Sequence, residues 1–174
     1  MTNGERVILL VTLASVTALA ACSSSGPSGS AATATTTTGA RASTPTTIST
    51  ASAGSTYLAD VAPANAAPTT FGANANAWTS STTNAQAEAE AQPTIAALQT
   101  LTSALTDGQW PAAATADVHT LIGDIGALTG DLQGLSTLNL LSDSSWTSTL
   151  KRDVSALSAA VGLVRHDLGL PAAA

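Results

Sequence analysis

The sequence has few charged and few aromatic residues. Only 9% of its 174 residues are charged and 3% are aromatic, although 44% are hydrophobic. Alanine accounts for 37 residues, so much of this hydrophobicity consists of methyl groups that each bury little area. The five basic residues are scattered along the chain, and the net charge is -6. Because nucleic-acid binding relies on clusters of Lys and Arg, we expect no nucleic-acid partner.

The chain also has a single cysteine, Cys22, which excludes an internal disulfide and a metal site made of several thiolates. A short polar segment with Arg6 is followed by an apolar run over residues 7–21. This run is shorter than the ~20 apolar residues that cross a bilayer. A charged start, an apolar stretch and small residues at its end predict a secretory signal peptide over residues 1–21.

The residues around the end of this peptide refine the prediction. Leu19, Ala20, Ala21 and Cys22 resemble the bacterial lipobox, in which the cysteine sulfur receives a diacylglyceryl group carrying fatty acids such as palmitate. The alternative is an ordinary signal peptide beside a stray cysteine. Two acyl chains anchor a protein stably, so the resemblance implies attachment through Cys22 to the outer, extracytoplasmic face of the cell membrane.

Residues 22–55 contain mostly Ser, Thr and Ala. Beyond the cysteine, Arg41 is the only charged residue and Ile48 the only large apolar one, so this segment has little with which to offset the entropy of folding. We expect a disordered tether, whose Thr-rich composition with Pro would suit O-glycosylation.

Residues 56–174 show apolar residues at helical spacings of three and four, and no sustained alternation typical of strands. The pattern is clearest in the last two segments. On the first of these the stripe consists of Val118, Leu121, Ile125, Leu128, Leu132 and Leu135. On the second it consists of Leu150, Val154, Leu157, Val161, Val164 and Leu168. Pro111 suits the start of the first, Gly134 a left-handed end of it, and Gly169 the end of the second.

Two earlier segments complete the helical part. A helix is predicted from about Asn84 to Asp107, with a capping box at Thr83 to Gln86 and a kink or a later start at Pro93. Before it, helical spacing continues from Tyr57 to Trp78. Pro63 and Pro68 interrupt this stretch, so we expect one kinked helix or two short ones. Its regularly spaced positions are Tyr57, Val61, Ala64, Pro68, Phe71, Ala75 and Trp78.

Four helical segments joined by short loops predict an all-α domain, an up-down-up-down four-helix bundle. In this topology Tyr57, Trp110 and Leu168 lie at the end where the tether enters. The far end is then the one expected to face a partner. Its apolar residues are Trp78, Leu138, Leu141 and Trp146.

The third helix carries Gly123, Gly126, Gly130 and Gly134, the last three spaced by four, and each glycine costs about 1 kcal/mol relative to alanine inside a helix. Close packing against an Ala-rich helix would explain them. The alternative is a groove that admits an apolar ligand.

Residues suited to catalysis do not form a recognisable pattern. His119 and His166 lie off the apolar stripes and lack a carboxylate at the spacing of a helical metal motif, so solvated side chains are expected. Asp117, Asp124 and Asp131 recur every seven residues, which indicates a solvated edge beside the core, with weak cation binding as the alternative. We therefore expect no enzymatic activity, no cofactor and no metal.

The lipobox, the Ser/Thr/Ala tether and the run Tyr57-Leu58-Ala59-Asp60-Val61-Ala62-Pro63-Ala64-Asn65 together resemble small actinobacterial lipoproteins of the mycobacterial type. The resemblance implies an envelope location and no particular reaction. Two functions remain open. One is a non-enzymatic bundle that binds an envelope protein or cell-wall component, and the other is a carrier or sensor of a small apolar ligand such as a lipid.

Overall fold

The computed structural model describes residues 48–137 and 144–173, and these residues form helices and the connections between them. The helices are α1 (Thr50–Asn76), α2 (Asn84–Asp107), α3 (Ala112–Gln133) and α4 (Ser144–Asp167). A short 3₁₀ helix, η1 (Gly134–Ser136), follows α3. The predicted all-α domain of four helices is confirmed.

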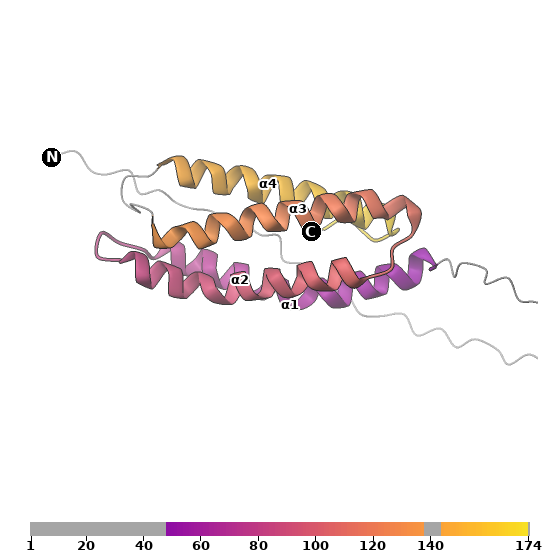
Figure 1. Cartoon of the computed structure of the whole chain (residues 1–174), viewed down its shortest axis with the longest axis horizontal. Helices are drawn as coiled ribbons and strands as arrows, with labels where there is room; N and C mark the ends of the chain where they lie inside the picture. The colour runs from indigo at the N-terminus through magenta and orange to yellow at the C-terminus, as the bar shows by residue number, and fades with distance from the viewer. Residues whose placement is uncertain (1–47, 138–143, 174) are drawn as a thin grey trace, which may run out of the picture.

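The helices pack in chain order, with α1 along α2, α2 along α3, and α3 along α4. Figure 1 shows all four lying lengthwise, with α3 and α4 on one side and α1 and α2 on the other. The pair that would close a compact bundle, α1 and α4, does not pack closely. The array is therefore open along one side.

Helix α1 begins six residues earlier than the predicted domain boundary at Thr56. Ser49 caps the helix by accepting a hydrogen bond at Oγ from the Ser52 backbone N–H at 3.2 Å. Ala53 and Gly54, assigned from sequence to the disordered tether, are buried. The prediction of a tether as far as residue 55 is therefore wrong for residues 50–55, because small residues suffice where a helix end meets another segment closely. Residues 1–47 lie outside the described residues.

The two prolines of α1 do not divide it. Pro63 and Pro68 both lie inside one helix, so the prediction of two short helices is wrong. Each proline removes one backbone hydrogen bond, yet its fixed φ is compatible with helical geometry. The apolar positions on either side remain buried, from Tyr57 to Ala75, and this burial holds the helix together across the two missing bonds. The kink stays a prediction.

Helix α2 has the predicted bounds and the predicted capping box. The Gln86 backbone N–H donates to Thr83 Oγ1 at 3.2 Å, and the Thr83 N–H donates to Gln86 Oε1 at 2.9 Å. Pro93 lies in the helix, so the alternative of a later start is wrong. This cap satisfies donors that the first turn leaves without helical partners.

The end of α3 differs from the prediction. Gly134 has a φ of -66° and is right-handed, because the chain tightens there into η1 instead of reversing. The left-handed stop is found after α4, where Gly169 has a φ of +64° as its sequence context predicts.

The predicted apolar stripes form the core. All six stripe positions of α3 and η1 are buried. On α4, Val154 and Val161 are only half-buried, which agrees with the open side of the array. Among the helices that the structure describes, none has the length and apolar character required to cross a membrane.

Candidate functional site

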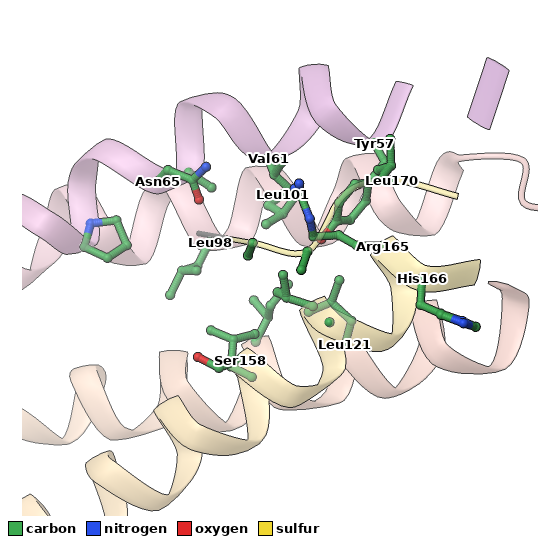
Figure 2. Close-up of a pocket in the computed structure, with 18 residues that line it drawn as sticks. Tyr57, Val61, Asn65, Leu98, Leu101, Leu121, Ser158, Arg165, His166 and Leu170 are labelled. Atoms are coloured by element: carbon green, nitrogen blue, oxygen red, sulfur yellow. The ribbon is translucent and has the colours of Figure 1, made fainter. Parts of the chain in front are cut away.

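A cavity of about 480 Å³ lies on the open side of the array, between α1 and α4. Its floor comes from α2 and α3, and the segment after α4 covers one end. Figure 2 shows apolar side chains of several elements converging on it. Its apolar lining includes Tyr57, Val61, Pro68, Leu98, Leu101, Leu121, Ile125, Leu157, Val161 and Leu170. This volume falls in the range of about 300 to 1,000 Å³ that is usual for ligand pockets.

Small residues on the two facing helices explain why the space is not filled. Beside larger side chains, the lining includes Ala64 from α1 and Ser158 and Gly162 from α4. A Cβ atom built on Gly162 would meet no atom within 4 Å. Short side chains cannot span the distance between two helices that do not pack closely, so the cavity follows from side-chain volume.

One end of the cavity contains a buried cation. Arg165 is only 5% exposed and lies in the last turn of α4. Its Nε donates to the carbonyl oxygen of Pro171 at 2.7 Å, whereas its Nη1 is buried without a hydrogen-bond partner among the described residues. A buried donor left without a partner costs about 1 to 3 kcal/mol, and more when it is charged. Because of this energetic cost, a buried Arg165 guanidinium is the least expected feature of an otherwise mostly apolar cavity.

Tyr57 lies beside this arginine. Figure 2 shows the Arg165 side chain running from α4 towards α1 with Tyr57 next to it, while His166 points away. Tyr57 is 1% exposed, and its hydroxyl is also buried without a hydrogen-bond partner among the described residues. Burial raises the pKa of Tyr57 to about 12, although Arg165 acts to lower it. The phenol is therefore neutral at physiological pH and can donate a hydrogen bond.

Residues 169–173, which we call the strap, turn back from α4 over this end of the cavity, as Figure 1 shows in yellow. The turn is a Schellman motif, in which the Gly169 N–H donates to His166 O at 3.0 Å and the Leu170 N–H donates to Arg165 O at 2.8 Å. Leu170 then packs against Gly54, where an added Cβ would lie 3.2 Å from Leu170 Cδ2. The strap thus joins the end of the helical domain to its beginning.

The groove predicted at Gly123, Gly126 and Gly130 is not this cavity. All three glycines lie on the exposed face of α3, and a Cβ built on any of them would meet nothing within 4 Å. Close packing and an apolar groove are therefore both wrong for these positions, because the buried face of α3 is filled by its Leu, Ile and Val stripe.

The predicted partner-facing end is only partly described. Trp78 is half-buried, packs edge-to-face on Phe71 and donates its indole N–H to Glu90 Oε2 at 2.8 Å. Trp146 is also half-buried and donates to the carbonyl oxygen of Asp131 at 3.0 Å. Leu138 and Leu141 lie outside the described residues, as do Cys22 and the lipobox residues Leu19, Ala20 and Ala21.

Two of the three regularly spaced aspartates meet acidic groups of α4. Partial burial and a hydrogen bond to the Asp167 carboxylate raise the pKa of Asp117, and partial burial together with the negative charge of Asp153 raises the pKa of Asp131. A hydrogen bond from Arg152 lowers the pKa of Asp153. These groups lie on the α3–α4 contact, away from the cavity. Within residues 48–137 and 144–173, no three His, Cys, Asp or Glu side chains gather as a metal site would require.

Arg165 and Tyr57 were not predicted as site residues. A signal for Arg165 exists in the sequence, because it lies four residues after Val161 and three before Leu168, on the apolar face of its helix. A charged residue at such a position is either paired or functional. The position of Tyr57 beside it depends on how α1 packs relative to α4, which spacing alone does not give.

Comparisons of the chain with protein-family models, with curated proteins and with solved structures find no match.

Proposed function

We propose that this protein binds a small apolar ligand in the cavity between α1 and α4, without catalysing a reaction on it. The observation that carries the proposal is the cavity itself, an apolar space of about 480 Å³ on the side where the helical array fails to close. Burial of an apolar ligand there would contribute roughly 25 cal/mol per Å² of apolar surface removed from water.

We propose that the protein is a lipid-anchored envelope lipoprotein, secreted with residues 1–21 as signal peptide and attached through Cys22. The lipobox pattern in the sequence supports this location. The Arg165 end of the cavity adjoins the first turns of α1, where the chain arrives from its N-terminal segment. An anchored protein would therefore hold this end of the cavity towards the membrane, which suits a ligand drawn from lipid.

We also propose that the four helices alternate in direction, in an up-down-up-down topology. Tyr57 and Trp110 pack edge-to-face with ring centroids 6.5 Å apart, which joins the start of α1 to the loop before α3. Asn84 Nδ2 donates to the carbonyl oxygen of Ser136 at 3.3 Å, which joins the start of α2 to the segment after α3. Both contacts support helices that alternate in direction.

Binding of an envelope protein or cell-wall component through the far end stays a prediction. Trp78 and Trp146 are half-buried, so they offer less free apolar surface than their sequence positions suggest. The apolar cavity is therefore the better supported site.

The test is binding of a neutral apolar fluorophore, N-phenyl-1-naphthylamine, to the full chain. Val161 lines the cavity, so Val161→Trp fills part of it and should raise Kd at least about tenfold, which corresponds to 1.4 kcal/mol. Val154→Trp is the matched control, one heptad earlier on the same helix, half-buried and outside the cavity lining. It should leave Kd within a factor of about two.

Absence of saturable binding to the wild-type chain would contradict the proposed function. Equal losses in the two tryptophan variants would show that the fluorophore binds elsewhere, which contradicts it as well. Far-UV circular dichroism of each variant checks that the helices remain folded.

A further inference from the structure

We infer that the ligand is a singly charged amphiphile, with a carboxylate head bound by Arg165 and Tyr57 and an apolar chain lying along the cavity. This inference rests on the proposed function and names the chemical class of its ligand. It starts from two polar groups that the described part of the fold buries and leaves without partners.

The first group is the guanidinium of Arg165. It has five N–H donors and stays charged at any physiological pH. The Pro171 carbonyl accepts one of these hydrogen bonds, and Nη1 has no acceptor among the described residues. The ion pairs found there are Arg152 with Asp153 and His166 with Asp167, so no acidic side chain in that part of the chain balances Arg165. An anion entering the cavity would supply the missing charge.

The second group is the Tyr57 hydroxyl. It lies on α1, across the cavity from the helix that carries Arg165, and both residues line the same space. Because its raised pKa keeps it protonated, Tyr57 can donate one hydrogen bond but cannot compete as an anion for the guanidinium. One charged donor and one neutral donor on opposite walls suit two oxygen atoms of a single head group.

A carboxylate fits these donors better than a phosphate monoester. Arg165 supplies one positive charge and its fork matches the planar carboxylate, whereas a phosphate monoester carries about -1.5 to -2 and needs further cations. Among the described residues, the other basic group that borders the cavity is His166, whose side chain is 85% exposed and points away. Apart from Asn65 and Ser158, the rest of the lining is apolar and suits a hydrocarbon chain.

The strap must shift for the head group to reach Arg165, because Nη1 and the Tyr57 hydroxyl are both shielded from solvent. Gly169 has the left-handed backbone conformation at the point where the strap leaves α4, so it is the natural pivot. Breaking the single Arg165–Pro171 side-chain bond would free another guanidinium donor for the ligand.

The experiment compares two fluorescent probes on the full chain at neutral pH, 11-(dansylamino)undecanoic acid and its methyl ester. The two share the chain and the fluorophore and differ in the charged head. Wild type should bind the acid about 10- to 100-fold more tightly than the ester, as expected for hydrogen bonds to a charged group. Arg165→Met should abolish this preference while ester binding persists.

Tyr57→Phe provides a second variant that removes only a hydroxyl without a hydrogen-bond partner among the described residues, so it should fold normally. It should weaken binding of the acid by about three- to tenfold and leave the ester unchanged. Arg152→Met is the matched control for charge, because Arg152 lies on the same helix and is mostly exposed. It should retain the preference for the acid.

Equal affinity of wild type for acid and ester would overturn the inference while the apolar cavity and the proposed function stand. A preference for the acid that survives Arg165→Met would also overturn it. Failure of wild type to bind either probe would overturn the proposed function together with the inference. A preference lost in Arg165→Met, reduced in Tyr57→Phe and retained in Arg152→Met supports the inference.

Discussion

Helix α4 borders two different regions, the tight α3–α4 contact and the open α1–α4 cavity. Towards α3, with which it packs closely, α4 places large side chains such as Leu150 and Val164, which are almost fully buried. Towards α1, the same helix lines the cavity with small residues, Ser158 and Gly162, as well as with Leu157 and Val161. Both regions have helical periodicity, so periodicity determines which face is buried, while side-chain volume determines whether two faces meet.

The largest expected difference between the regions comes from truncating matched leucines of α4. Leu150 is 2% exposed and outside the cavity lining, so Leu150→Ala should lower the free energy of unfolding by about 2 to 5 kcal/mol. Leu157, seven residues later, is 8% exposed and already faces the cavity. Leu157→Ala should cost roughly half as much, because fewer packed atoms lose contacts. Urea unfolding measures the loss of stability in both variants. Equal losses would contradict the distinction between the tight contact and the open cavity.

A smaller difference in stability is expected between alanine substitutions at a glycine with free space around it and at a glycine packed against the strap. Gly126→Ala should stabilise the protein by about 0.5 to 1 kcal/mol, because alanine favours the helix and its Cβ meets nothing. Gly54→Ala gains the same propensity but presses on Leu170 of the strap, so its net stabilisation should be smaller. It should also speed release of the undecanoic acid probe, measured by stopped-flow displacement. A larger stabilisation by Gly54→Ala than by Gly126→Ala would contradict close packing at the strap.

The smallest expected effect concerns the acidic groups on the α3–α4 contact. Since the pKa values of Asp117 and Asp131 are raised in the folded state, their ionisation opposes folding, and this opposition fades as pH falls from neutral towards their usual 3.8. The pKa of Asp153 is lowered, so its contribution is present above pH 3.8 and is lost as pH falls through its folded-state value. Stability should therefore peak at mildly acidic pH.

Asp131→Asn isolates the contribution of the Asp131 carboxylate to the pH dependence of stability. It should raise the free energy of unfolding at neutral pH by less than about 1 kcal/mol and flatten the rise in stability towards acid. Asp124→Asn on the same helix is the control. Urea unfolding at pH 7 and pH 5 gives the comparison, and an unchanged slope in Asp131→Asn would contradict repulsion between the two helices.

The sequence predicts the helices of this fold better than its site. Residues such as Val118, Leu121 and Ile125 recur at helical spacing and are all buried, and the Thr83–Gln86 cap is confirmed because its hydrogen bonds are local. The start of α1 was predicted too late because Ala53 and Gly54 carry no apolar signal. The burial of Gly54 depends on the strap, more than 110 residues away along the chain.

The cavity could not be predicted from spacing. It results from the lack of close packing between the first and last helices. The spacing of apolar residues along a helix does not give the distance between two helix faces. The regular spacing of the glycines of α3 predicts close packing or a groove, yet these glycines lie on the exposed face of the helix. Arg165 could have been singled out as a charge on an apolar face, but its pairing with Tyr57 required the packed structure.

The contact between Gly54 and Leu170 has a mechanical consequence. It places the start of α1 directly against the strap, so a pull on the chain before Ile48 would reach this contact through Ile48, which packs on the core, and the first turn of the helix. Tension that peels the first turn away from the domain would release Leu170 and expose the end of the cavity that holds Arg165. Force applied at the N-terminal side and access to the cavity would thereby be linked through the packing of Gly54 on Leu170.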